Sequence, residues 1–183
     1  MRLHFNEAKA AAVAALILKL RGGTMHYIKL VKLMYLVDRS ALLRWGTIVT
    51  TDHHVSMDQG PVGSSVLDLI TKDVPKPIWS HYISDPFGED EIRLSREGST
   101  EKLSRAEEKL IREIYDQFGY MDRWKLVKYT HDLPEYKDPH GTSIPIHPRE
   151  ILRAEGESEE EIKVTLRELR IADAVEDSIP SVR

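Results

Sequence analysis

The sequence predicts a mainly α-helical protein of the α+β class, in which a helical domain carries a small antiparallel β-hairpin or sheet insertion. Apolar residues recur at helical spacing through most of the chain, and residues that favour helix N-termini precede several of these stretches. Only residues 78–84 (IWSHYIS) and 91–95 (EIRLS) are expected to pair as short strands, on either side of the turn-rich segment DPFGEDE. The sheet should therefore be a minor part of the fold.

Two helices are expected in the N-terminal quarter of the chain. Asn6 can cap a helix that runs to Arg21 and ends at Gly22. Thr24 is predicted to cap a second helix that continues to Gly46. Apolar residues cover most of the circumference of this second helix, so we expect it to be the central helix of the fold.

Four charged residues of the second helix carry different expectations. Lys29, Lys32 and Arg39 are expected on the narrow polar face that the apolar positions leave. Asp38 instead lies on the apolar stripe, where a carboxylate must be paired or hydrogen-bonded. We expect it to be buried beside a Lys, an Arg or a helix N-terminus. The functional alternative is a binding anchor or a general base, but the sequence indicates no partner histidine or second carboxylate.

A third helix is predicted to open at Gly60-Pro61-Val62, with Pro61 in its first turn, and to end near Thr71. Residues 47–58 before it are expected to be extended. Backbone N–H groups at such a helix start could hold an anion or a carboxylate of a partner. The glycine pattern of a phosphate-binding loop is absent, so a structural turn is the default interpretation.

The second half of the chain contains further helix signals. Ser104 with Glu107 predicts a capping box for a helix to Phe118, and Asp122 can cap the next helix. His131 is expected at the end of that helix, where its ring can bond the last carbonyls.

Residues 133–149 contain four prolines and are predicted to be an ordered loop or an open linker. A short helix (REILRAEG) should follow. A second capping box, Ser158 with Glu161, should then begin a last helix that reaches about Val175.

Charge is unevenly distributed over the 183 residues, whose formal net charge is −4. Residues 1–50 contain eight Lys or Arg and two Asp or Glu, whereas residues 155–183 contain four basic and nine acidic residues. The basic front end could meet nucleic acid or an acidic protein surface, although solvated helix faces explain both runs. The N-terminus resembles a core helix more than a signal peptide or a membrane span, so we expect a cytoplasmic protein.

No catalytic or metal-binding constellation is predicted. The chain has no cysteine, no nucleophile elbow and no HExxH motif. His53 and His54 are adjacent, so on a strand they would point to opposite faces. His131, His140 and His147 lie in or near the proline-rich segment without a known ligand spacing. We therefore expect neither an enzyme nor a protein with a metal or a cofactor.

Three segments together resemble the Panacea domain, also called the SocA-like or phage-associated antitoxin domain. They are IKLVKLMYLVDRSALLRWG, MDQGPVGSSVLDLI and LSRAEEKLIREIYDQFGYMDRWKLVKYTHDLPEYKDP, and their order and spacing match the family over roughly residues 5–140. One departure is that Pro134 is followed by Glu135 and Tyr136, where the family often has Pro-Trp. The residues that match the family motif are Lys32, Tyr35, Asp38, Arg39, Gly60, Pro61, Val62, Thr130 and His131.

The resemblance implies an antitoxin that neutralises a cognate protein toxin by direct binding. Some members of the family instead act as proteolytic adaptors that deliver the toxin to a AAA+ protease. On this basis we expect a Panacea domain over residues 1–140 and a C-terminal helical extension over residues 141–183, packed on the same domain. The alternative is a nucleic-acid-binding regulator of a phage or mobile element that uses the basic N-terminal helices. The acidic segment DPFGEDE is unlike the basic tip of a nucleic-acid-binding wing.

The toxin-binding surface is expected in the hairpin at 78–95 and in the proline-rich segment at 133–149. Both offer aromatic residues beside polar groups, the composition that anchors interfaces. The candidates are Trp79, Tyr82, Phe87, Glu89, Asp90, Glu91 and Tyr136. For Trp79 and Tyr82, packing of the sheet onto the helices is an equally good explanation.

Overall fold

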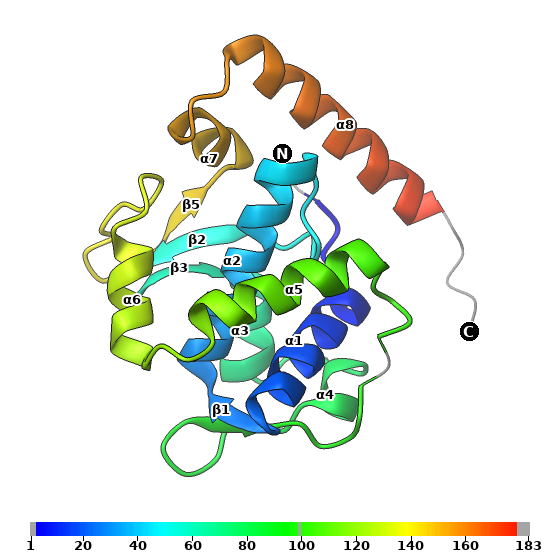
Figure 1. Ribbon diagram of the computed structural model, residues 1–183, viewed down its shortest axis with the longest axis vertical. Helices are drawn as coiled ribbons and strands as arrows, with labels where there is room; N and C mark the ends of the chain where they lie inside the picture. The colour runs from blue at the N-terminus through cyan, green and yellow to red at the C-terminus, as the bar shows by residue number, and fades with distance from the viewer. Residues whose placement is uncertain (1–2, 99, 179–183) are drawn as a thin grey trace.

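The computed structural model describes residues 3–98 and 100–178, and these form eight helices and five short strands (Figure 1). The predicted class, mainly α with a small β component, is confirmed. Helix α2 (Tyr27–Trp45) runs through the middle of the fold and contacts α1 (Glu7–Arg21), α5 (Arg105–Phe118) and α6 (Arg123–His131). Most of its side chains are buried, as its apolar circumference predicts.

The remaining elements are shorter, apart from the last helix. The other helices are α3 (Ser64–Thr71), α4 (Trp79–Tyr82), α7 (Pro148–Ala154) and α8 (Glu159–Ser178). The strands are β1 (Thr24–His26), β2 (His54–Met57), β3 (Gly60–Gly63), β4 (Glu91–Arg93) and β5 (Ile144–Ile146). They form two antiparallel sheets, with orders β1-β4 and β3-β2-β5.

The first helix is confirmed, but the expected start of the second is wrong. Asn6 caps α1 by accepting a hydrogen bond from Lys9 N. Thr24 does not cap a helix, because residues 24–26 pair with β4 as a strand. The cap of α2 is His26, whose Nδ1 accepts a hydrogen bond from Ile28 N at 3.2 Å. The start of α2 is set by pairing of residues 24–26 with β4, which lies far along the chain, and the residues around Thr24 give no signal of it.

The third helix also begins later than predicted. Pro61 does not occupy its first turn; it lies in β3, paired with Ser56 of β2. Helix α3 starts at Ser64, and Asp52 satisfies its first N–H groups by accepting hydrogen bonds from Ser65 N and Val66 N, both at 2.9 Å. A carboxylate from an earlier loop therefore replaces the cap residue that the sequence lacks at this point.

Residues 78–95 are not a simple hairpin. Residues 79–82 form the short helix α4, whose first N–H groups donate to a carboxylate oxygen of Glu7. Only 91–93 form a strand, and it pairs with β1 instead of with 78–84; a single bridge, Ile83 to Leu94, joins the two expected strands. Trp79 is 1% exposed in the main core, so the expectation that it is an exposed anchor is wrong.

The C-terminal segments pack on the same central helix. Both predicted capping boxes, at Ser104 and Ser158, are present. A second apolar cluster joins Leu42 of α2 to residues of α7 and α8 such as Ile151 and Ile162. Residues 1–2 of the expected domain and 179–183 of the expected extension lie outside the described residues.

Candidate functional site

The family-motif residues of α2 face inward, each toward a different segment of the chain. Lys32, Tyr35 and Asp38 are buried, and Arg39 is largely covered. The expectation that Lys29, Lys32 and Arg39 form an exposed polar face is therefore wrong. Every residue of α2 from Ile28 to Asp38 is buried, because β3 packs against Lys32 and other segments cover the remaining sides. The segment after α6 covers Arg39 through Glu135.

Asp38 is buried and hydrogen-bonded, as predicted, with 2% of its surface exposed. Its carboxylate accepts hydrogen bonds from the backbone N–H of Thr50, at 3.0 Å, and from the Thr50 hydroxyl. The Nε2 of His54 lies 3.3 Å from the same carboxylate. The expected partners, a Lys, an Arg or a helix N-terminus, are wrong, and His54 is a histidine partner that sequence reasoning missed.

A second buried polar group joins α2 to the segment after α6. The hydroxyl of Tyr35 donates to Glu135 at 2.6 Å, and Arg39 Nε donates to the same carboxylate at 2.7 Å. Burial acts to raise the pKa of Glu135, but hydrogen bonds from Arg39 and Tyr35 outweigh it and lower that pKa. Burial, with the neighbouring Glu135 charge, raises the pKa of Tyr35 well above its usual value. Arg39 also pairs with Glu155 after α7.

Lys32 holds the turn between β2 and β3. Its ammonium donates to the carbonyl of Pro61 at 2.9 Å, and burial lowers its pKa to about 7. Gly60 beside it has a φ of +94°, a region that glycine adopts without strain. A Cβ at Gly60 would lie 2.9 Å from Lys32 Nζ, 2.9 Å from Thr130 Oγ1 and 2.8 Å from His131 Cδ2. The motif residues of α2, β3 and α6 therefore meet around this glycine.

His131 ends α6, as predicted, but its ring makes a contact that the sequence did not indicate. It stacks on Tyr136, with centroids 4.5 Å apart and planes 6° from parallel. Its Nε2 is enclosed and has no hydrogen-bond partner among the described residues. Tyr136 is half-buried and donates its hydroxyl to Met57 O at 3.3 Å, so it supports the β2–β3 turn from the outside.

The candidate toxin-binding residues divide between the core and the surface. Tyr82 is half-buried and packs against the core beside the buried Trp79. Residues 87–91, by contrast, form an exposed loop that ends in the first residue of β4 and carries Phe87 and all three expected acidic side chains. Arg93 lies over the Phe87 ring, 4.6 Å from its centroid. This acidic loop is the part of the expected surface that remains accessible.

Exposed aromatic residues at the start of α6 were not among the candidates. Tyr120 is 75% exposed and Trp124 is 56% exposed. Trp124 lies in the same helix as the buried Leu126 and Val127 but is not buried with them. The polar neighbours on either side of it, Arg123 and Lys125, are the sequence signal that could have placed it at the surface.

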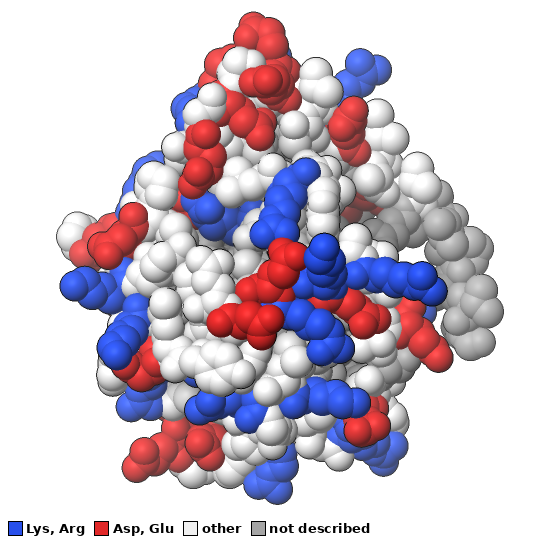
Figure 2. Space-filling view, in the orientation of Figure 1, with Lys and Arg blue, Asp and Glu red and all other residues white. Residues whose placement is uncertain are grey.

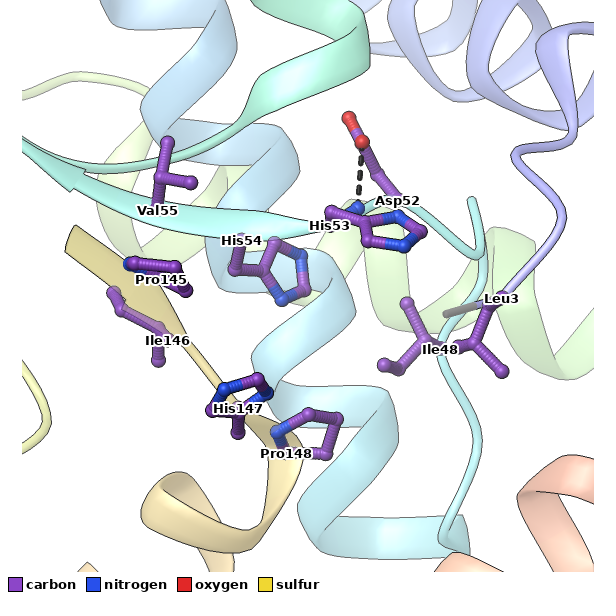
Figure 3. A pocket seen from close by; sticks show the side chains of 10 residues that line it. All are labelled: Leu3, Ile48, Asp52, His53, His54, Val55, Pro145, Ile146, His147 and Pro148. Atoms are coloured by element: carbon purple, nitrogen blue, oxygen red, sulfur yellow. Dashed lines mark hydrogen bonds between the residues drawn. The ribbon is translucent and has the colours of Figure 1, made fainter. Parts of the chain in front are cut away.

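A hollow of about 220 Å³ lies between β2, β5 and the N-terminal segment. Figure 3 shows the side chains that line it. Its lining residues are Leu3, Ile48, Asp52, His53, His54, Val55, Pro145, Ile146, His147 and Pro148. His53, which precedes β2, and His54, its first residue, point in different directions, and His147 lies across from His54 (Figure 3). Within residues 3–98 and 100–178, no group of three His, Asp or Glu is placed to hold a metal ion.

Surface charge is mixed over most of the visible face. Figure 2 shows acidic side chains gathered at the top of the view, where the turn between α7 and α8 lies, and both signs interspersed over α5. Basic residues of the N-terminal quarter contribute to this mixture, because Lys9 pairs with Glu107 and Arg44 with Glu113. No described helix is long and apolar enough to cross a membrane.

Comparison with known proteins links this arrangement to one family. Searches of curated proteins and of solved structures gave no match. The family model for the antitoxin SocA-like, Panacea domain matches residues 30–137. The matched range begins in α2 and ends just after Tyr136, so it contains all the segments that converge on Gly60 and Asp38. This protein therefore belongs to the antitoxin SocA-like, Panacea domain family, and that membership supports an antitoxin role.

Proposed function

We propose that this protein is an antitoxin that neutralises a cognate protein toxin by binding it directly. The observation that carries the proposal is the family match over residues 30–137, which covers more than half of the chain. The structure also supports it. The buried residues Lys32, Tyr35 and Asp38 of α2 hold distant segments of the chain together, so the exposed loops can vary without loss of the core.

The proposed toxin-binding face includes the acidic loop 87–91 and the start of α6. Both segments contact the region around α2: Glu91 of the loop pairs with His26, the cap of α2, and α6 packs against α2. Asp90 is joined to the start of α2 through its carbonyl, which accepts a hydrogen bond from Tyr27 N at 3.0 Å. Exposed Phe87 and Trp124 supply the aromatic anchors that protein interfaces commonly use.

The alternative, a nucleic-acid-binding regulator, is less well supported. Binding to phosphates needs exposed Lys and Arg side chains gathered on one face. In the N-terminal quarter, Lys29 and Lys32 are buried. Four other basic residues there pair with carboxylates, namely Lys9, Lys19, Arg39 and Arg44. Most of these basic residues are thus buried or already paired with carboxylates of the same chain, and they do not gather into one exposed basic face.

We further propose that residues 141–183 extend the domain that residues 1–140 form. The ion pair between Arg39 and Glu155 and the apolar cluster around Leu42 support packing of this extension on the same domain. Delivery of the toxin to a AAA+ protease is a finer form of the same proposal, in which the bound toxin would be degraded instead of only covered.

The test is co-expression with a toxic open reading frame encoded beside this protein. Growth should be rescued, and the tagged antitoxin should copurify with the toxin at a fixed stoichiometry. Following the toxin level after synthesis is stopped separates the two mechanisms: a stable toxin indicates occlusion, and a toxin that disappears only in protease-proficient cells indicates an adaptor. Rescue without copurification or toxin loss would refute direct binding.

A further inference from the structure

A pocket of about 260 Å³ lies between the first turns of α2 and the turn that joins β2 to β3. Its walls are mainly apolar and include Ile28, Val31, Val62 and Leu67. The lining also contains Lys32, whose Nζ lies beside Gly60, another lining residue. A single cationic side chain thus borders a hollow whose walls are mainly apolar but also include Asp58.

Lys32 is 1% exposed, and no carboxylate of the described residues forms an ion pair with it. Its ammonium can donate three hydrogen bonds, and Pro61 O accepts one of them. A buried charge without a counter-charge is costly, and such groups are normally paired. The lowered pKa of about 7 reflects that burial. The site is therefore incomplete for a charged lysine, and an anion in the pocket would complete it.

Size and donor number define the anion. A pocket of this volume is smaller than the roughly 300–1,000 Å³ that drug-sized ligands and cofactors occupy, so one side chain fits it better than a cofactor does. Phosphate sites gather several N–H or Arg donors, whereas Lys32 is the cationic group here. Asp58 at the lining would also repel a dianion more than a monoanion. Apolar walls suit the methylene groups of an acidic side chain.

We propose that this pocket binds the carboxylate of an aspartate or glutamate side chain of the partner protein, with Lys32 as its counter-ion. This inference rests on the proposed antitoxin function and names one anchor of the complex. The pocket borders the proposed face, because its lining residue Tyr27 bonds to Asp90 of the acidic loop. Lys32 would then both hold the β2–β3 turn through Pro61 O and bind a carboxylate of the partner.

Binding should depend on pH. The titratable groups near Lys32 are Tyr27 and Asp58, which line the same pocket, and His131, whose ring lies beside Gly60. Because the amine must be protonated to pair with a carboxylate, affinity should fall about tenfold per pH unit above its pKa of about 7.

The first experiment uses blocked glutamate, N-acetyl-glutamate methylamide, as the probe and the full chain as the receptor. At pH 6.5, millimolar probe should shift the backbone amide resonances of Gln59 and Gly60, whereas blocked glutamine should not. Lys32→Met should abolish the shifts. Lys29→Met is the matched control, because Lys29 is also buried on α2 but does not line the pocket, and it should bind like wild type. Equal shifts in Lys32→Met, or none in wild type, would overturn the proposal.

The second experiment uses the toxin once copurification has identified it. Lys32→Met should weaken the complex at least tenfold, and Lys29→Met should not. If the two variants bind the toxin equally, the pocket is not an anchor, although the antitoxin proposal stands. If no toxin copurifies with wild type, the antitoxin proposal fails, and the blocked-glutamate titration alone decides whether the pocket takes a carboxylate.

Discussion

The hydroxyl of Tyr35 donates a 2.6 Å hydrogen bond to Glu135, which lies one hundred residues further along the chain. The same carboxylate accepts from Arg39, so one acidic side chain ties the segment after α6 to two positions of the central helix. Together with the contacts of Asp38 and Lys32, this makes α2 the element to which the loops of the domain are attached.

Replacing Glu135 should test this attachment. Glu135→Ala would leave the Arg39 guanidinium and the Tyr35 hydroxyl without their buried acceptor, so we expect a loss of about 3–5 kcal/mol in the free energy of unfolding. Tyr35→Phe removes one hydrogen bond and should cost about 1–3 kcal/mol. Urea denaturation measures both. Glu113→Gln, at an exposed pair with Arg44, is the control and should change little. A Glu135→Ala protein as stable as the control would contradict the role given to this carboxylate.

Asp38 should matter for folding instead of for chemistry. Asp38→Ala would leave the Thr50 N–H without its buried acceptor, and we expect a cost of about 1–3 kcal/mol, since the partners include no Lys or Arg. Asp38→Asn keeps an acceptor oxygen and should recover part of the loss. Thermal and urea unfolding would show this order. Loss of toxin neutralisation by a variant of unchanged stability would instead point to a direct functional role.

Two glycines should resist substitution for different reasons. Gly60→Ala would place a Cβ on a left-handed backbone and crowd it against Lys32 and Thr130. It should lower the free energy of unfolding by about 1–3 kcal/mol through backbone strain alone, and by more if the neighbours cannot move. Gly63 has an ordinary φ, but a Cβ there would collide with the Asp52 carboxylate. Gly63→Ala should therefore cost about 1–2 kcal/mol through loss of the α3 cap. Gly141→Ala, where φ is positive but nothing is near, separates backbone strain from crowding. Equal losses at Gly60 and Gly141 would show that crowding is unimportant.

Lys32 should give the stability of the protein a distinctive pH dependence. Its folded pKa of about 7 lies below its unfolded value near 10.4, so between these values the unfolded chain binds more protons. The stability of wild type relative to Lys32→Met should therefore rise with pH through this window, by at most about 1.4 kcal/mol per unit. Below pH 7 the full penalty for the buried charge applies, and Lys32→Met should be the more stable protein. Denaturation curves of both proteins from pH 6 to pH 10 measure the difference. If the difference in free energy of unfolding between the two proteins does not vary with pH, the Lys32 ammonium is stabilised in the folded protein as well as it is in water.

Substitutions on the proposed toxin-binding face should reduce toxin neutralisation without unfolding the protein. Reversing Glu89 and Glu91 to Lys, with Asp90→Asn to keep a residue that tolerates its φ of +62°, should weaken toxin neutralisation with little change in melting temperature. Trp124→Ala should do the same, because the ring is more than half exposed. Exposed charges at Lys109 and Arg112 on α5 provide the control reversals. If the 89–91 and Trp124 variants neutralise the toxin fully and the α5 variants do not, the toxin binds the α5 face instead of the proposed one.

The sequence by itself determined the elements whose signals are local. Capping boxes at Ser104 and Ser158 start their helices because the reciprocal hydrogen bonds involve residues three positions apart. The left-handed Gly22 ends α1 for the same local reason. The burial of Asp38 was predictable from its place on an apolar stripe. The family motifs were recognisable as well, because their order and spacing are properties of the chain.

Only the tertiary structure decided which distant segments meet. Residues 24–26 become a strand because β4 lies beside them, and α3 begins after Pro61 because Asp52 supplies the cap from another loop. Lys32 carries the charge of a surface residue and yet is buried, since β3 covers its face of α2. Such contacts join residues at least 13 positions apart in the chain, and helical or strand periodicity contains no information about them. For that reason the sequence led to the family, whereas the pocket beside Lys32 required the fold.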